Sequence, residues 1–506
     1  MNVLLVPPHG DFTLEWPAPE GFWVVDAARA FIRRALSPEA LRAEITAREP
    51  STRDAEGARA LLLLKAASAL LGTALLGTGD SHRHLRAVGA ALTGLSSAAC
   101  PVRLRLDDLE LPGATTEKSA DVLAAAARPG APYDSSLAWA VEQCARAEVV
   151  RIRLDGDQQL PSVMALLERL RGGRHRLELT GAFAATHWGA LARLSLLEGV
   201  TWVDSGGTGP RMAGSPLLSS AGTDLRWVDD PYHFGPPRAF WGGAVPFGAL
   251  ADARALIATG PQVLVLGFCA LGDEAVGADG TVLSARDFRA ALDALRTAGV
   301  RLVGEWWIGA PGIGADALER TLRELEHAPF DWLAGVRAFH WLAGRGDGTW
   351  GRVEVSAGSV GEGRDLARSR PFSAPGSLGA EEAAARLRDL AQALAKRAPL
   401  APGRMAEAFV ELPSPPPERG DRVRLDPDCA LVTLPLGLDG RVGSATYAAN
   451  LRTGGVMAVD GRLAPSLAKL EAPASVADAL PQVPEGQRPK LVKALVEKAV
   501  LVEVRG

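Results

Sequence analysis

Two stretches of the chain alternate short apolar runs with amphipathic helical segments. In the first stretch, apolar or alternating runs at residues 3–6, 149–154, 176–180 and 200–204 predict β-strands. Between the second and third runs, apolar residues recur at helical spacing over 161–170. Strand, helix and strand joined by short connections favour parallel pairing, so this part is expected to form an open α/β domain.

A second alternating series follows a segment rich in Gly, Ser and Pro at 206–220, which is expected to be a linker. Three further runs have strand character: 263–268, 300–308 and 332–341. Ser284 opens a capping box before a helix that would bury Phe288 and Leu292, and another amphipathic helix covers 316–327. Repeated βα units of this length predict a (β/α) barrel or part of one.

The remaining chain changes character after an Ala-rich helix predicted over 381–396. The proline cluster at 413–417 predicts a stiff connection and a domain boundary. The tail beyond it predicts three short strands, three helices and a closing strand: 423–425, 430–434 and 456–459, then 466–470, 475–480 and 487–498, then 500–504. This order of elements in a short tail suits a winged-helix module.

The amino-acid composition excludes several classes of function. The 506 residues are 47% hydrophobic and 23% charged, ordinary values for about three globular domains. With 55 Lys and Arg against 59 Asp and Glu, the net charge is −4, so no basic excess indicates a nucleic-acid partner. Four cysteines with no close pair predict neither a disulfide framework nor a thiolate metal site, and favour a reducing compartment.

One segment is apolar enough to be considered for a membrane. Residues 60–79 are apolar except for Lys65. On a membrane-insertion scale, the unfavourable free energy of this lysine and of the many small residues offsets the favourable contribution of the leucines. A buried helix, a protein that does not bind membranes and a cytoplasmic location are therefore expected. After this helix, Asp80, His82 and His84 have metal-ligand residue types at a spacing that matches no ligand set, and a solvated turn is expected there.

Several local strings resemble cobalamin-binding-domain radical SAM proteins, particularly those of peptide natural-product maturation. Residues 3–8 (VLLVPP) are similar to the first strand of the family's cobalamin-type Rossmann-like domain. Residues 263–268 (VLVLGF), followed by Gly272-Asp273-Glu274, look like a barrel strand that ends in an acidic pair. Residues 304–312 (GEWWIGAPG) resemble the glycine-proline-glycine turn that helps hold SAM.

The tail resembles the PqqD-like peptide-recognition winged helix. The resemblance implies an α/β protein of four segments: a cobalamin-binding-like Rossmann-type domain at 1–212, a radical-SAM-like partial barrel at 213–400, a Pro-rich linker at 401–420 and the PqqD-like module at 421–506.

The chain departs from this family where the family carries its chemistry. A CxxxCxxC loop after the first barrel strand should hold a [4Fe–4S] cluster, yet residues 237–248 (PRAFWGGAVPFG) contain no cysteine. The degenerate loop retains these residues: Phe240, Trp241, Val245, Phe247 and Gly248. An aromatic set around it would either plug the vacated cofactor site or line a new pocket: Trp227, Tyr232, His233, Phe234, Phe240 and Trp241.

No [4Fe–4S] cluster is therefore expected. The cobalamin-ligating DxHxxG string is also missing, because Asp80-Ser-His82 is followed by Leu85 in place of glycine. Some family members bind cobalamin without a histidine ligand, so cobalamin or SAM remains possible.

The candidate ligand-pocket residues lie at the expected barrel mouth: Asp273, Glu274, Glu305, Trp307, Gly309, Gly312 and His340. Asp273 and Glu274 follow a strand that would end at the mouth, with a solvated turn as the alternative. Alternation places Glu305 on the face of Trp307. An inward carboxylate would be ligand-facing, whereas a structural ion pair or an outward position is the alternative. His340 would contact a ligand or be a satisfied core histidine.

The leading functional interpretation is a non-catalytic protein that binds a precursor peptide, or a partner maturation enzyme, in ribosomal peptide maturation. It rests on lost cluster ligands beside a retained scaffold, and a homo- or hetero-oligomer is compatible with it. One alternative is a cluster-independent enzyme with Glu305, Asp273 or His340 as acid or base. Another alternative is a cobalamin or SAM carrier.

Overall fold

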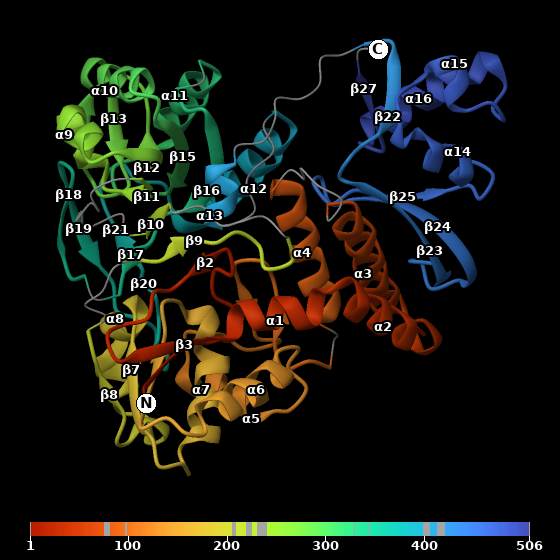
Figure 1. The fold of residues 1–506 in the computed structure, drawn as a ribbon. Helices are drawn as coiled ribbons and strands as arrows, with labels where there is room; N and C mark the ends of the chain where they lie inside the picture. The colour runs from red at the N-terminus through yellow and green to blue at the C-terminus, as the bar shows by residue number, and fades with distance from the viewer. Residues whose placement is uncertain are drawn as a thin grey trace.

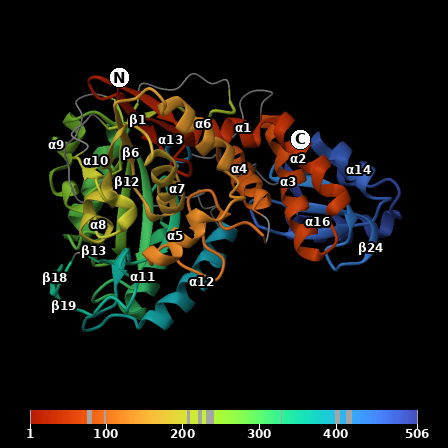
Figure 2. The same cartoon turned by 90° about the horizontal axis from the view of Figure 1, so that it is seen from below.

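The chain forms two α/β units and a C-terminal module (Figure 1). The computed structural model describes residues 2–74, 81–96, 99–204, 209–218, 225–229, 240–327, 329–343, 345–397, 405–411 and 420–504. Viewed from below, the C-terminal module lies beside helices α2 (Pro38–Arg48) and α3 (Ala55–Ala74) (Figure 2).

The N-terminal unit is built on a five-stranded parallel sheet. Its strand order is β3 (Phe22–Asp26), β1 (Asn2–Val6), β6 (Val149–Arg153), β7 (Arg176–Thr180) and β8 (Thr201–Trp202). In order of appearance along the chain this is 2-1-3-4-5, a doubly wound arrangement. The predicted parallel strands are confirmed, although β8 is shorter than its apolar run.

Helices complete this unit, and their apolar faces explain why they form. Helix α7 (Leu160–Leu170) buries the apolar residues predicted at helical spacing. The other helices that pack around the sheet are α1 (Ala27–Leu36), α5 (Ser119–Ala127), α6 (Asp134–Cys144) and α8 (Ala182–Leu191).

The part of the chain between the first two predicted strands contains α1 to α3 and α4 (Ser81–Leu95). Most leucines of α3 are buried in the protein core, as predicted for a buried helix. In the part of the chain that the structure describes, no helix is long and apolar enough to cross a bilayer.

The second unit contains five parallel strands that lie side by side in chain order. They are β10 (Arg226–Asp229), β11 (Trp241–Val245), β12 (Pro261–Ala270), β15 (Arg301–Ile308) and β16 (Trp332–Ala338). Antiparallel strands extend the sheet: β13 (Glu274–Gly277) and β14 (Val282–Ser284) beside β12, and β9 (Arg211–Met212) and β2 (Leu14–Glu15) beside β10. Since β2 belongs to the N-terminal segment, this sheet joins the two units.

Helices α9 (Ala253–Ala258), α10 (Ala285–Thr297), α11 (Ala315–Glu326) and α12 (Ala380–Arg397) follow the strands of this unit. Ser284 is the N-cap of α10, because its side chain accepts a hydrogen bond from the Asp287 backbone N–H. Alternate residues of β12 and β15, such as Phe268 and Trp306, pack with Phe288 of α10 in one core. The opposite side chains belong to a different core.

Part of the degenerate loop is a strand. Residues 241–245 form β11 between β10 and β12, and Phe247 opens a 3-10 turn that includes Gly248. A Cβ atom on Gly243 would lie 1.7 Å from the Val228 carbonyl oxygen, so the two glycines at 242 and 243 allow the strands to pair closely. Trp241 and Val245 are buried against the helices, while Phe240 is 65% exposed.

Both expected linkers contain ordered elements. The segment at 206–220 includes β9, and the 401–420 segment includes helix α13 (Ala406–Val410). Glycine and proline content predicted connections here, but Ala406, Ala408 and Phe409 are buried and hold α13 in the core. The proline cluster at 413–417 lies outside the described residues.

The C-terminal module has two antiparallel three-stranded sheets and three helices. One sheet is β23 (Cys429–Leu436), β24 (Val442–Asn450) and β25 (Val456–Val459), and the other is β26 (Ala474–Ser475), β22 (Arg422–Leu425) and β27 (Leu501–Val504). The helices are α14 (Ala464–Ala468), α15 (Val476–Ala479) and α16 (Arg488–Glu497). The predicted tail elements are present, and the pattern missed β24 and the short β26.

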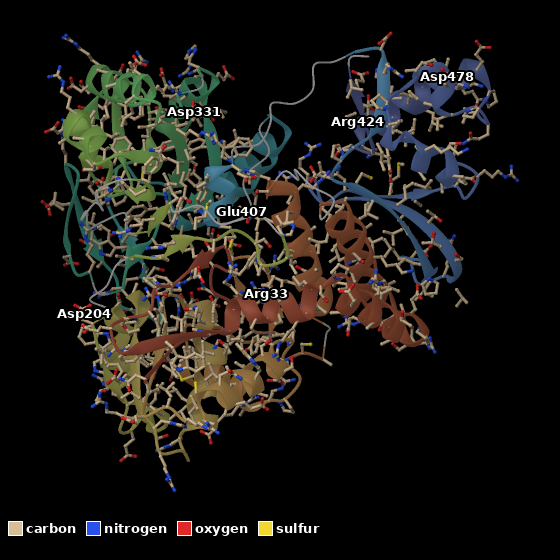
Figure 3. All side chains as sticks on the ribbon, viewed as in Figure 1. Arg33, Asp204, Asp331, Glu407, Arg424 and Asp478 are labelled. Carbon is tan, nitrogen blue, oxygen red and sulfur yellow. The ribbon has the colours of Figure 1, made fainter. Side chains whose placement is uncertain are left out.

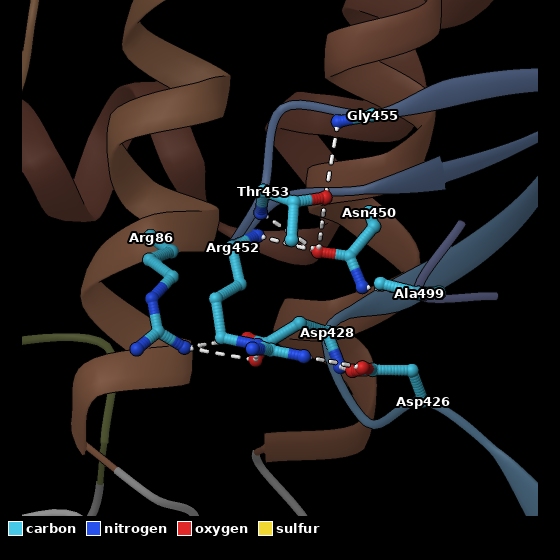
Figure 4. Close-up of polar contacts among 8 residues, drawn as sticks. All are labelled: Arg86, Asp426, Asp428, Asn450, Arg452, Thr453, Gly455 and Ala499. Atoms are coloured by element: carbon cyan, nitrogen blue, oxygen red, sulfur yellow. Dashed lines mark hydrogen bonds and ion pairs between the residues drawn. The ribbon is translucent and has the colours of Figure 1, made fainter. Parts of the chain in front are cut away.

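A buried ionic network ties this module to α4 (Figure 4). Arg86 of α4 donates to both carboxylate oxygens of Asp428, at 2.8 and 2.9 Å. Arg452 lies 2.6 Å from Asp426 and 3.3 Å from Asp428. Burial raises the pKa of Asp428 against the opposing effect of Arg86. The paired guanidinium therefore offsets part of the cost of burying this carboxylate.

Replacing Arg86 with Ala should destabilise the protein by about 3 kcal/mol, because Asp428 would keep a buried charge without its bidentate partner. The loss should be smaller in an Asp428→Asn background, where that charge is absent. Urea unfolding of the wild type, the two single variants and the double variant measures the coupling between the two side chains. Arg441→Ala, whose side chain is 88% exposed, is the control. Equal costs of Arg86→Ala in both backgrounds would contradict the interpretation.

Candidate functional site

The inner face of the second sheet, opposite helices α9 to α11, is occupied by the chain itself. Val263, Val265 and Val303 on this face share a core with Phe409 of α13. The rings of Trp227 and Phe409 stack with centroids 5.9 Å apart. A helix of the protein therefore lies where a barrel of this kind would keep its interior site.

The beginning of α4 meets α13 in a polar cluster, which we define as Ser81, His82, His84, Ser215, Glu407 and Glu411; all but Glu411 are buried. Figure 3 labels Glu407 where the second unit meets α4. Ser81 Oγ lies within hydrogen-bond distance of Glu407 Oε1, at 3.0 Å, and of the Glu411 carboxylate, and its single proton is donated to one of them at a time. His82 Nε2 lies 2.9 Å from the Glu411 carbonyl oxygen, and its ring packs edge-on against Trp332.

The histidines expected in a solvated turn are thus buried in a helix. His82 and His84 are at most 1% exposed, because the polar first turn of α4 inserts between the units. His84 Nε2 hydrogen-bonds Ser215 Oγ over 2.6 Å. Burial and, to a smaller extent, Arg83 together lower the pKa of His84 to about 4, so the ring is neutral at physiological pH.

Glu407 is the most perturbed carboxyl group of the cluster. Burial raises its pKa to about 7, and the nearby carboxylates of Glu411 and Asp11 raise it as well, although the hydrogen bond from Ser81 opposes them. Its Oε2 atom has no hydrogen-bond partner among the described residues. A carboxyl group in this position holds its proton over much of the neutral range.

The cluster is better suited to holding the units together than to binding a metal. In the described ranges, no three His, Cys, Asp or Glu side chains are arranged as metal ligands. The Nε2 atoms of both histidines are engaged within the protein. The backbone N–H of Ala406 also donates to Asp11 Oδ2 over 3.0 Å, which fixes the start of α13 to the loop after β1.

The pocket residues predicted from sequence do not converge. Glu305 is 4% exposed and lies on the inner face, where its Oε1 is 3.5 Å from Arg337 Nε on β16. This ion pair is the structural alternative considered for it. Trp307 is half-buried on the same face, and its indole lies close to Gly267.

The other candidates also contact neighbouring parts of the chain. Asp273 and Glu274 are exposed at the start of β13, and Glu274 pairs with Arg352 at 3.0 Å. Gly309 and Gly312 have positive φ angles. A Cβ on Gly309 would lie 3.0 Å from Ala383, and one on Gly312 would lie 2.6 Å from Val353.

His340 lies apart from these residues at the end of β16 and is exposed on the surface. Partial desolvation and Arg368 lower its pKa, while Glu117 raises it. Arg368 also pairs with Asp157 of the N-terminal unit at 3.3 Å. His340 is therefore near the contact between the two α/β units.

The N-terminal sheet would bind a ligand at the carboxyl ends of β1 and β6, where the strand order reverses. That position is filled by the loop after β1 and by Asp157, which accepts a hydrogen bond from Thr116 over 2.5 Å. The cavity beside His9 and Phe12 measures about 10 Å³, room for one water molecule at most. These residues do not fit the tail of a cobalamin-sized cofactor.

The cysteines do not fit a [4Fe–4S] cluster either. All four are in described residues, and Cys144, Cys269 and Cys429 lie in three different hydrophobic cores. Burial raises the pKa of Cys144 to about 11 and that of Cys429 to about 12, and it raises the pKa of Cys269 strongly. Three thiolates that could hold one cluster are not brought together.

Of the aromatic set around the degenerate loop, Trp227 and Trp241 are buried and Phe240 is exposed. Tyr232, His233 and Phe234 lie outside the described residues. Trp241 donates through Nε1 to the Thr259 carbonyl over 3.1 Å, so it faces α9 and not the interior. Trp227 does pack in the interior, but its partner Phe409 could not have been found from the local sequence.

Comparisons with known proteins identify no family. No protein-family profile and no curated protein matches the chain. Two solved structures of the radical S-adenosylmethionine methyltransferase TsrM from Kitasatospora setae are weakly similar. One holds the tryptophan substrate and a SAM analogue, and the other holds cobalamin and a [4Fe-4S] cluster. Each is 12% identical with a TM-score of 0.23, and they cover 79% and 77% of this chain and 90% of TsrM. Similarity this weak establishes no shared activity.

Replacing Glu407 with Gln should stabilise the protein at and above neutral pH. Glu407 has a pKa of about 7 in the folded state against 4.5 ordinarily, so the folded protein binds more protons than the unfolded chain between these values. The stability contributed by this group is therefore lost as pH rises through that window. Glutamine does not ionise, so the variant should gain up to about 3 kcal/mol over the wild type above the window, and little below it.

Urea unfolding across this pH range measures the difference between the two proteins. Glu142→Gln, at an exposed glutamate of α6, is the control and should show no such trend. A constant difference between Glu407→Gln and the wild type at all pH values would contradict the assigned titration.

Proposed function

We propose that the protein is a non-catalytic, radical-SAM-like subunit that acts in the cytoplasm during ribosomal peptide maturation. It would bind a precursor peptide or a partner maturation enzyme. The observation that carries this proposal is the occupied inner face of the second sheet, where Phe409 stacks on Trp227. A protein whose own chain covers the inner face of this sheet has its outer surfaces left for function.

The separated cysteines support the same proposal. Reductive SAM cleavage needs a cluster with an open iron, and three of the four thiols here are buried in different cores. The alternative of acid–base catalysis by Glu305 is less well supported, because that carboxylate is ion-paired with Arg337 and lines neither the groove described below nor the small cavity beside His9.

The C-terminal module offers a physical route to peptide binding in a PqqD-like manner. Strands β25 and β27 are the ends of their sheets in the described chain, and Val456 of β25 is 46% exposed. An extended peptide can add to such an edge through its backbone, with side chains in neighbouring pockets. Strand β23, on the other side of β24, already contacts α3, because Lys65 of α3 donates a hydrogen bond to the Thr433 carbonyl over 2.7 Å.

Anaerobic reconstitution with iron, sulfide, SAM and hydroxocobalamin tests the non-catalytic part. After desalting, iron and sulfide should remain well below one atom per chain, and 5′-deoxyadenosine should not form under reducing conditions. An established radical SAM enzyme treated in parallel is the control. About four irons per chain with SAM cleavage would overturn this part of the proposal.

Affinity capture with the proteins encoded beside it, including any small precursor peptide, tests the binding part. We expect one of them to bind with a Kd of about 1 μM or tighter. The control is a Lys65→Ala variant, in which α3 loses its hydrogen bond to β23 of the module. It should bind equally well. If neither a peptide nor an enzyme from this set binds the wild type, the binding part fails.

A further inference from the structure

A groove of about 1010 Å³ lies on the N-terminal unit between β3, the segment after β2 and helix α1. None of the predicted site residues lines it. Its walls combine three tryptophans with three arginines of one helix: Trp16, Trp23, Trp139, Arg29, Arg33 and Arg34. We call it the β3 groove.

The β3 groove runs beside an open sheet edge. Strand β3 pairs with β1 in parallel and ends the sheet in the part of the chain that is described. Phe22, Trp23 and Val24 of this strand line the groove directly. A strand at the end of a sheet has backbone N–H and C=O groups directed away from its single neighbour, and these can pair with another extended chain.

The charge of the groove is predominantly positive. Arg33 and Arg34 are exposed and form no ion pair with any residue in the described ranges; Figure 3 labels Arg33 on α1. Arg29 is fixed in place, since it donates to the backbone carbonyls of Phe12 and Gly214 at 2.7 and 2.8 Å. Arg211 contributes a further guanidinium to the groove wall.

Two of the tryptophan rings of the groove contact arginine guanidinium groups, and the third is partly exposed to solvent. The Arg34 guanidinium lies 5.0 Å from the centroid of the Trp139 ring, and that of Arg153 lies 3.2 Å from the Trp16 ring. Trp23 is 36% exposed on the edge strand. Exposed tryptophan beside arginine is typical of surfaces that bind other chains, because both side chains carry much binding energy.

We propose that the β3 groove binds an extended acidic peptide segment, which adds as a strand to β3. Alternate acidic side chains would pair with Arg33 and Arg34, and the intervening apolar side chains would pack on Trp23 and Trp139. This inference rests on the proposed peptide-binding function and adds the site and the charge of the peptide.

A nucleic acid would use the same residue types but fits the groove less well. Glu15 and Asp26 also line the groove, and their carboxylates oppose phosphates and acidic side chains alike, so the strand edge decides between the two occupants. Asp26 is retained for a structural reason, because it caps α1 by accepting a hydrogen bond from the Arg29 backbone N–H over 2.9 Å. The open strand edge, in addition, has a partner in a peptide backbone and none in a nucleic acid.

Fluorescence anisotropy with a labelled peptide that alternates glutamate and valine tests the inference on the full chain. Arg33→Glu combined with Arg34→Glu should weaken binding at least roughly tenfold, because two charge-assisted contacts become repulsive. Arg53→Glu combined with Arg59→Glu changes the net charge equally on exposed positions outside the groove and should leave the affinity nearly unchanged. Circular dichroism confirms that both variants fold.

Two further probes separate strand addition from simple charge attraction. The same peptide with alternate backbone amides methylated should bind at least roughly tenfold more weakly, because it cannot complete the pairing with β3. A labelled oligothymidylate of equal charge should bind more weakly than the peptide. Equal loss of affinity in both arginine pairs, indifference to methylation, or tighter binding of the oligonucleotide would each overturn the inference.

Repeating the affinity capture with the Arg33→Glu and Arg34→Glu variant distinguishes this inference from the proposed function. Loss of the captured peptide supports the groove. A peptide that still binds the variant as well as the wild type excludes the groove and leaves the proposed function intact. Absence of any captured partner on the wild type contradicts the proposed function itself.

Discussion

The arrangement of this protein depends on the burial of polar side chains along one helix, α4. A buried polar group must find a partner, and those of α4 find theirs in different parts of the chain. Ser81 donates to Glu407 on α13, His84 pairs with Ser215 near β9, and Arg86 pairs with Asp428 of the C-terminal module. Moving any of these parts away would leave a buried group unpaired, so α4 fixes the relative positions of all three.

This constraint also explains why the second sheet lacks an open interior. The contact between Ser81 and Glu407 places α13 against the inner face, and Phe409 then fills the space beside Trp227. A cofactor in that space would have to displace an apolar side chain and expose the polar cluster at the same time. The separation of the cysteines and the filling of this space are therefore consistent with one another, and both direct attention to the outer surfaces of the molecule.

Local patterns in the sequence were sufficient to predict the helices and strands that bury one face along their whole length. Helix α10 and strand β12 follow from periodicity and capping alone, and the βα order implied parallel pairing. The pattern failed where burial comes from distant contacts. The residues just before His84 in the sequence are polar, yet its side chain is buried, and it contacts Ser215, which lies 131 positions away. Likewise, the resemblance described for residues 237–248 predicted a loop, whereas the close pairing of Gly243 with β10 makes it part of a strand.

The β3 groove could not be anticipated either, because its arginines and tryptophans come from separate segments that meet only in the fold. Its composition nevertheless has a consistent physical role. An open strand edge invites pairing with a second copy of the same chain, and proteins commonly prevent this with charge. Arg33 and Arg34 beside β3 would repel the same arginines on another copy, while they attract a strand of opposite charge. The same two side chains can thus exclude self-association and select an acidic partner.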